Sequence, residues 1–243
     1  MKNKVVELDQ ALAAFKDGQT ILFADWHGEI SAEEIITGLI EKGVKDITAV
    51  GVSGGMPDQG LGRMIVNHQI KKLLTTHIGL NPVAKEQYVA GELDVEFIPQ
   101  GTFTERIRCA GYGLGGCLTP TGVGTAVAEG KQILNLNGKD YLLEMPIRGD
   151  VALIKATKGD TAGNICFNKT SGAISNTMAF AADVVVCELE ELVEVGELEP
   201  DEIDVPAPVV DMIYVRKGEK KPFCPMWQRA KAKAEAKAAE GGK

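Results

Sequence analysis

The stretch 20-TILFADWHGEISAEEIITGLIEKGVKDITAVGV-52 decides the fold of this chain. Its two apolar runs, Thr20 to Ala24 and Ile47 to Val52, predict strands. Between them, apolar residues recur with a helical period, from a capping box at Ser31-x-x-Glu34 to a glycine stop at Gly43. The stretch therefore predicts a strand, a helix and a second strand.

The same cycle repeats along the first half of the chain. It predicts strands over Lys71 to Ile78 and Val95 to Ile98, and helices over Leu61 to His68, over Pro82 to Ala90 and from Thr102. Strands that alternate with helices at this spacing pair in parallel through helical crossovers. We therefore expect an α/β fold built on an open, mainly parallel sheet.

The second half of the chain has a different pattern. Two apolar runs, Lys131 to Leu136 and Asp140 to Met145, flank Asn137-Gly138, a strong short-range hairpin signal. We predict a small antiparallel insert there. Further elements are predicted as strands over Val151 to Ala156, Val184 to Leu189 and Val209 to Tyr214, with a helix over Ala173 to Ala182.

Length and charge limit the possible functions. The 243 residues suit one domain, which we predict over 1–222, followed by an Ala/Lys/Glu-rich tail over 223–243 that has no apolar stripe. A net charge of -8 and a pI near 5.1 argue against nucleic acid or an anionic membrane as a partner, because such partners need clustered Lys and Arg. No 18-residue apolar run predicts a membrane span.

Cysteine and histidine usage indicates neither disulfides nor a metal. The five cysteines lack Cys-x-x-Cys spacing and fit a reduced, cytoplasmic protein in which they are small apolar fillers. His27, His68 and His77 are scattered without the spacing of a zinc site, so no metal is expected. His27 lies two residues after Asp25. The sequence is compatible with an acid–base pair between these two side chains and also with two side chains that do not interact.

Gln100 ends a predicted parallel strand, and the carboxyl ends of such strands are where open α/β sheets bind ligands. Its amide offers a donor and an acceptor to a carboxylate or thioester oxygen. Two interpretations stay open, because the same side chain can instead tie the loop to a neighbouring backbone group.

A glycine-rich segment follows, with Gly111, Gly113, Gly115 and Gly116 before the run Leu118-Thr119-Pro120-Thr121. Glycines allow a backbone to approach a ligand closely, and they also make ordinary tight turns. The segment follows a helix and lacks the strand-to-helix setting of a dinucleotide fingerprint.

Carboxylates in the second half have structural interpretations. Glu144 precedes Arg148 by four residues, which favours an ion pair between them over a catalytic role for Glu144. The acids Glu188, Glu190, Glu191, Glu194 and Glu197 alternate in part with apolar residues, so we expect them on the polar face or edge of a strand.

Several long segments resemble one known family when they are taken in order. They are 95-VEFIPQGTFTERIR-108, 110-AGYGLGGCLTPTGVGT-125, 141-YLLEMPIRGDVALIKATKGDTAGN-164 and 188-ELEELVEVGELEPDEIDVPAPVVD-211. Together with shorter matches, they cover about residues 5 to 218 and resemble the first (alpha) subunit of family I coenzyme A transferases, the succinate, butyrate and acetate:3-oxoacid type.

The resemblance implies a three-layer α/β/α sheet fold, here with the small antiparallel insert, and a ping-pong exchange of CoA between a short-chain acyl-CoA and a short carboxylic or 3-oxo acid. In the family the attacking glutamate lies on the second (beta) subunit, so no catalytic residue is expected in this chain. The implied partner is that second subunit, in a hetero-dimer or hetero-tetramer. The CoA thioester enters as a substrate, and no permanently bound cofactor is expected.

The resemblance also assigns site residues. The family glutamine of Pro-Gln-Gly-Thr matches Gln100, next to Gly101, and would touch the acyl or carboxylate end of the substrate. The glycine-rich segment Gly111 to Gly116 would lie beside it as a CoA or acyl loop.

Two loops depart from the family pattern. Where members carry Gly-Gly-Phe-x-x-x-Gly-x-Pro, this chain has Ala24 to Ala32, which includes Asp25, Trp26, His27 and Glu29. Where members carry Ser-Asn-Asn-Ala-Gly, it has Gly51 to Gly55, which includes Ser53.

These side chains are candidates for substrate binding. One hypothesis is a polar or cationic acyl group, with Asp25 or Glu29 as counter-charge and Trp26 as a cation–π face. The alternative is that the side chains only vary a surface loop. The departures also leave open an acyl-CoA hydrolase subunit or a non-catalytic ligand-binding homologue in place of the transferase.

Overall fold

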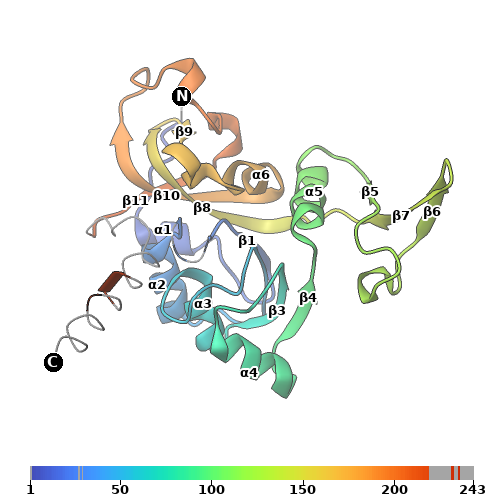
Figure 1. The fold of residues 1–243 in the computed structure, drawn as a ribbon. Helices are drawn as coiled ribbons and strands as arrows, with labels where there is room; N and C mark the ends of the chain where they lie inside the picture. Colours follow the sequence, from blue (N-terminus) through green and yellow to red (C-terminus); the bar gives the residue numbers. More distant parts are fainter. Residues whose placement is uncertain (1, 27, 29, 219–230, 233–234, 236–243) are drawn as a thin grey trace.

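The computed structural model describes residues 2–26, 28, 30–218, 231–232 and 235. Figure 1 shows a large twisted sheet between helical layers, and a smaller sheet that projects to one side. The tail predicted over 223–243 lies almost wholly outside the described residues. Among the described residues, no helix is long and apolar enough to span a bilayer.

The main sheet has the strand order β11-β10-β8-β1-β2-β3-β4, and β9 pairs with β8. All its strand pairs are parallel except β8 with β9. The strands are β1 (Thr20–Phe23), β2 (Ile47–Gly51), β3 (Ile70–Thr75), β4 (Asp94–Phe97), β8 (Gly149–Asp160), β9 (Ile165–Cys166), β10 (Ala182–Val193) and β11 (Met212–Val215). The expected parallel sheet is confirmed, and β8 and β10 run well past their predicted ends.

Helices cover both faces of this sheet (Figure 1). The first layer holds α1 (Leu8–Leu12), α2 (Glu33–Lys42), α3 (Gly60–Val66) and α4 (Pro82–Ala90), and the second holds α5 (Gln100–Gly111) and α6 (Ser175–Phe180). Short 3-10 turns are η1 (Ala126–Ala128), η2 (Lys169–Gly172), η3 (Pro200–Glu202) and η4 (Ala207–Val209). The three-layer α/β/α fold is therefore confirmed.

Strand alternation explains why two cores form. Ile21 and Phe23 of β1 point into the core under the first helical layer, while Leu22 points into the core under the second. All three are buried. Each such side chain contributes about 1.5 to 3 kcal/mol on burial, which is why both faces need a helical cover.

The smaller sheet is the predicted antiparallel insert. It has the order β5-β7-β6, built from β5 (Cys117–Thr119), β6 (Ile133–Leu136) and β7 (Lys139–Glu144). Asn137 and Gly138 both have positive φ angles, 53° and 79°, as a two-residue hairpin turn requires. We call residues 117–144 the arm, because they project from the main body in Figure 1.

The expected ion pair between Glu144 and Arg148 is wrong. Glu144 is buried and its carboxylate lies 2.7 Å from Lys131 Nζ and 3.8 Å from Arg106. Arg148 pairs with Asp183 instead. The register of β7 turns Glu144 toward α5. Its ion pair with Arg106 of that helix joins the root of the arm to the body.

Two helix starts also differ from the prediction. α2 begins at Glu33 after Ala32, and the capping box at Ser31 does not form. α5 begins at Gln100, two residues earlier than expected, because the Pro99 carbonyl already accepts the N–H of Phe103. Gln100 is therefore the first residue of the helix.

Candidate functional site

The predicted site residues follow the carboxyl ends of neighbouring strands. Asp25 follows β1, Ser53 follows β2 and Gln100 follows β4, with β3 between the last two. Adjacent strands are about 4.8 Å apart, so Asp25 and Gln100 are separated by roughly 14 Å along this edge. The candidates form a row along the sheet edge, not one cluster.

Asp25 is buried and its carboxylate is bound by backbone amides. Its Oδ1 accepts the N–H of Gly28 at 2.6 Å, and its Oδ2 accepts the N–H of Leu61 at 2.9 Å. The carboxylate therefore caps the N-terminus of α3, where a negative charge is favoured. Within the described residues, this places Asp25 in the framework that holds the loop.

The loops after β1 and β2 are packed on each other. A Cβ at Gly28 would lie 2.4 Å from Gln59 Oε1, and one at Gly60 would lie 1.9 Å from Asp25 Oδ2. Glu33 adds a second tie, since its Oε1 accepts the N–H of Gly60 at 2.8 Å while its Oε2 pairs with Arg63 at 3.0 Å. The two loops that depart from the family pattern are therefore built as one unit.

Ser53 lies inside this unit. It is 4% exposed, and its Oγ accepts the N–H of Gly55 at 3.2 Å. Trp26, by contrast, is 41% exposed. His27 and Glu29 lie outside the described residues, so the structure says nothing of their predicted roles.

Gln100 lies at an open helix start. Its side chain is exposed, and it makes no hydrogen bond to any residue in the described part of the chain. Gly101 beside it has no atom within 4 Å of an added Cβ, and the buried Thr102 hydroxyl lacks a partner among the described residues. The interpretation of Gln100 as a loop tie therefore finds no contact to support it.

The start of α5 is suited to bind an anion. The N–H groups of Gln100, Gly101 and Thr102 precede the first intrahelical bond, so they have no partner within the helix. The helix dipole adds a partial positive charge at the same point. A carboxylate or a developing oxyanion fits these donors.

The glycine-rich segment lies at the opposite end of α5. Gly111 ends the helix, and Gly113 follows it with a φ of 69°. The 12 residues of α5 span about 18 Å, so Gly111 to Gly116 do not lie beside Gln100 as expected. Gly116 is required for packing, since its Cβ would meet the Glu144 carbonyl oxygen at 2.7 Å, whereas Gly113 and Gly115 face open space.

Glu188 is a second acid, after Glu144, whose role the sequence pattern predicted wrongly. It is 0% exposed, and its Oε2 accepts the N–H groups of Glu34 at 2.9 Å and of Ile35 at 3.0 Å. It therefore caps α2 from strand β10, in place of the capping box expected at Ser31. The expectation that this acid lines a polar face is wrong, because β10 is a central strand and both its faces are covered.

Charged side chains surround Glu188. Glu34 of α2 accepts the Tyr214 hydroxyl at 2.7 Å and lies 3.6 Å from Arg216. Lys155 of β8 stands opposite Glu188 in the register but pairs with Glu190 at 2.8 Å. Burial raises the pKa of Glu188 to about 7, against the opposing effects of the Ile35 amide and Arg216.

Three of the four described cysteines are thiols with a raised pKa. Burial raises the pKa of Cys117 to about 11 and also raises the pKa of Cys166 and Cys187. Such thiols stay protonated at neutral pH and are poor nucleophiles. The interpretation of these cysteines as apolar fillers agrees with this environment. Among the described residues, no group of three or more His, Cys, Asp or Glu side chains is placed to hold a metal ion.

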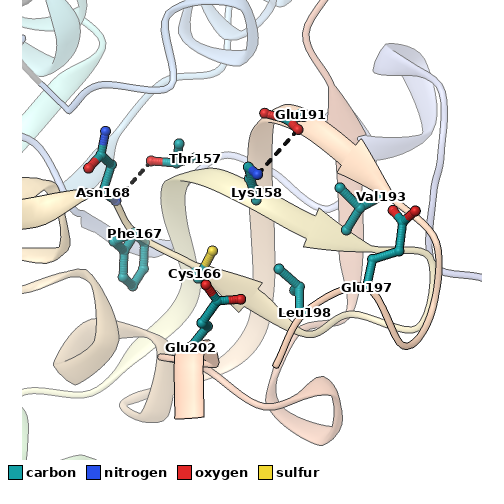
Figure 2. Close-up of a pocket in the computed structure, with 10 residues that line it drawn as sticks. All are labelled: Thr157, Lys158, Cys166, Phe167, Asn168, Glu191, Val193, Glu197, Leu198 and Glu202. Atoms are coloured by element: carbon teal, nitrogen blue, oxygen red, sulfur yellow. Dashed lines mark hydrogen bonds and ion pairs between the residues drawn. The ribbon is translucent and has the colours of Figure 1, made fainter. Parts of the chain in front are cut away.

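A cavity of about 710 Å³ lies at the carboxyl ends of β8 and β10, and Figure 2 shows its lining. It is bounded by Thr157, Lys158, Cys166, Phe167, Asn168, Glu191, Val193, Glu197, Leu198 and Glu202. Lys158 is paired with Glu191 at 3.5 Å. Two further carboxylates, those of Glu197 and Glu202, line the cavity. These charges disfavour the phosphates of an anionic ligand, and the cavity includes none of the predicted site residues.

The fold and this row of strand ends belong to a known class. The family model for coenzyme A transferase matches residues 5–216, and the chain belongs to that family. It is 44% identical over 220 residues to the alpha chain of the acetate CoA-transferase of Escherichia coli K12, covering 90% of this chain and 100% of that one. It is also 44% identical over 219 residues to the corresponding chain of a Helicobacter pylori succinyl-CoA:3-ketoacid coenzyme A transferase, covering 90% and 94%.

Solved structures show the same fold. The acyl-CoA transferase of Escherichia coli O157:H7, in a thioester complex with CoA, matches with a TM-score of 0.81 at 20% identity. The match covers 92% of this chain and 49% of that one, so this chain spans about half of that polypeptide. At this identity, the likeness establishes the fold alone.

Proposed function

We propose that this chain is the first, alpha-type subunit of a two-subunit CoA-transferase that moves coenzyme A between a short-chain acyl-CoA and a short carboxylic or 3-oxo acid. Family membership and the names of its relatives, which are single chains of such two-subunit enzymes, support the proposal. The attacking glutamate is supplied by the second subunit, so this chain contributes no catalytic residue. CoA takes part as a thioester substrate, and the reaction is placed in the cytoplasm.

The observation that carries the proposal is the open start of α5. Attack of the second subunit's carboxylate on the acyl thioester puts negative charge on the carbonyl oxygen, until the CoA thiolate leaves and an acyl anhydride remains. The thiolate then attacks the glutamyl carbonyl and releases the acid. Gln100 and the unpaired amides beside it supply donors for such an oxygen without any rearrangement of the chain.

Other residues take different parts in the proposal. Asp25 is a positioning residue, because its carboxylate oxygens accept the N–H groups of Gly28 in the loop after β1 and of Leu61 at the start of α3. In this proposal Trp26 packs against the acyl group, and its 41% exposed surface leaves room for that contact. Ser53 shapes the loop after β2, and Gly113 and Gly115 offer open backbone to CoA or to the second subunit.

The test is turnover by the chain assembled with its second subunit. Gln100→Ala should lower kcat/KM by about tenfold to a hundredfold, because one oriented hydrogen bond to a charged oxygen contributes about 1.5 to 3 kcal/mol. Gln100→Glu should lower it further by repelling carboxylates, while leaving Tm unchanged or raised, since an acid is favoured at a helix start. Gln10→Ala, at an exposed glutamine in α1 outside the arm and the site, is the control.

The same assay separates the competing activities. A transferase releases CoA only when an acceptor acid is present, whereas a hydrolase releases it with water alone. Absence of turnover with every acid tried, in an intact assembly, would support a non-catalytic homologue. Unchanged kinetics in both Gln100 variants would remove Gln100 from the site.

A further inference from the structure

The arm has two chemically different faces, because successive residues of a strand point to opposite sides. The register pairs Leu118 with Leu143 and Leu134 with Tyr141. Leu136 lies two residues beyond Leu134 and points the same way. We call the surface made by these five side chains the apolar face of the arm.

The opposite face is covered by the chain itself only at the root of the arm, since Ile133, which pairs with Leu142 on that face, is 51% exposed. Leu142 and Glu144 point there and are buried. The loop that contains Gly122 packs on it, since a Cβ at Gly122 would lie 2.8 Å from Val127 and 3.3 Å from Leu142. Lys131 closes the same side through its pair with Glu144.

The apolar face is only partly covered. Leu134, Tyr141 and Leu143 are half-buried, and Lys139 Nζ on this face lies 5.5 Å from the centre of the Tyr141 ring. Leu118 is 41% exposed and Leu136 is 43% exposed. Neither of the two hydrophobic cores formed by the described residues includes a residue of this face. Figure 1 shows why, since the arm projects away from both helical layers. Leu118 and Leu136 are therefore open to contact with another molecule.

We propose that the apolar face of the arm docks the second subunit of the enzyme through an apolar surface of that subunit. The inference rests on the two-subunit assembly proposed above and adds the surface that this chain uses.

Size favours the second subunit over another copy of this chain. The three strands have three, four and six residues. At a spacing of about 4.8 Å they present a face of at most roughly 14 by 20 Å, or about 280 Å². Two such faces pressed together bury about a third of the roughly 800 Å² per partner found in stable interfaces. The second subunit must also reach the start of α5 to complete the active site, so its contact extends beyond the arm and makes up the remaining area.

The experiment compares apolar-to-charged variants on and off the arm. Leu118→Glu should weaken the affinity for the purified second subunit, to a Kd about thirtyfold or more above wild type, because a central apolar contact is replaced by a buried charge. Val89→Glu on α4 is the matched control, since Val89 is 85% exposed outside the arm. It should change the affinity less than about threefold. Calorimetric titration measures the affinity of each variant.

Folding is checked on the chain alone. Leu118→Glu should leave its circular dichroism and Tm unchanged, because Leu118 is already exposed. If that variant disturbs the arm, Leu136→Glu beside the hairpin turn replaces it, with the same expected loss of affinity.

Two results would overturn the proposal. One is unchanged affinity for the second subunit in a folded arm variant. The other is an arm variant that abolishes self-association of the chain alone while the second subunit still binds normally, which would assign the face to another copy of this chain. If assembly depends on the arm but the complex shows no transferase activity, the proposed function is contradicted and the docking surface is still supported.

Discussion

The main sheet and the arm differ in what covers their strands. In the main sheet, Phe23 packs under one helical layer and Leu22 under the other, and both are buried. In the arm, Leu142 is buried beneath its own loop, whereas Leu118 on the opposite face is 41% exposed. The main sheet completes its cores within the chain, whereas the arm keeps apolar side chains exposed, which we propose another molecule covers.

Polar groups show the same contrast. The carboxylates of Asp25, Glu33 and Glu188 each accept backbone N–H groups at helix starts of the first layer. The Gln100 side chain, at the start of α5, bonds to no group in the described part of the chain and leaves its amide exposed. These three acids bond to backbone groups inside the chain, whereas the Gln100 side chain faces open space.

The largest effect is expected from Glu188→Ala in the main sheet. The N–H groups of Glu34 and Ile35 lose their acceptor, and an unsatisfied buried donor costs about 1 to 3 kcal/mol. We expect the free energy of unfolding at pH 6 to fall by about 3 kcal/mol in urea denaturation. Glu191→Ala, at an exposed position of the same strand, should change it by less than about 0.5 kcal/mol. Equal effects would show that Glu188 does not hold α2.

The next largest difference in the free energy of unfolding is expected between alanine substitutions at two glycines, Gly60 and Gly115. Gly60→Ala places a Cβ 1.9 Å from Asp25 Oδ2 at a φ of 52°, so the free energy of unfolding should fall by more than about 2 kcal/mol. Gly115→Ala, at the root of the arm, meets no atom within 4 Å and should be neutral in the chain alone. Thermal and urea denaturation of both variants measure the difference. A neutral Gly60→Ala would mean that the fused loops yield easily.

The third prediction concerns pH. The folded chain holds the Glu188 proton more tightly than the unfolded chain, because burial raises the pKa from 4.5 to about 7. The contribution of Glu188 to stability therefore declines as pH rises from about 4.5 to 7 and then levels off. Glu188→Gln keeps an oxygen for the two amides and has no proton to lose. Its free energy of unfolding should rise relative to wild type between pH 5 and 8, by up to about 2 kcal/mol.

Urea denaturation at several pH values measures this relative stability. The exposed variant Glu191→Gln is the control and should track wild type across the range. A constant offset between Glu188→Gln and wild type would show that Glu188 does not titrate in this window.

Local sequence patterns predicted the parts that depend on local chemistry. The alternation after Thr20 predicted the parallel sheet, and Asn137-Gly138 predicted the hairpin of the arm. The Pro99-Gln100 segment placed Gln100 at a strand end, although the helix begins there and not at Thr102. These features follow from backbone conformation and hydrophobic period, which neighbouring residues determine.

Contacts between distant segments were not predictable in this way. Glu188 caps α2 from far along the chain, as its separation of 154 residues from Glu34 shows. An acid in an alternating run looks the same whether its strand lies at an edge or at the centre of a sheet. The partner of Glu144 and the separation of Gln100 from Gly111 to Gly116 depend likewise on register and helix length, and sequence spacing specifies neither.

The smallest predicted effect comes from two matched turn substitutions, one beside the main sheet and one in the arm. Asp46, before β2, and Asn137, in the arm, both adopt positive φ angles, 57° and 53°. Alanine at either position costs about 1 kcal/mol of backbone strain. Asp46→Ala should lower the global free energy of unfolding by this amount, because β2 belongs to the cores. Asn137→Ala should instead speed hydrogen exchange of the β6 and β7 amides about fivefold and leave the global value unchanged, because the arm opens locally. If Asn137→Ala lowers the global value as much as Asp46→Ala does, the arm unfolds together with the body, and the contrast between a self-sufficient sheet and a dependent one fails.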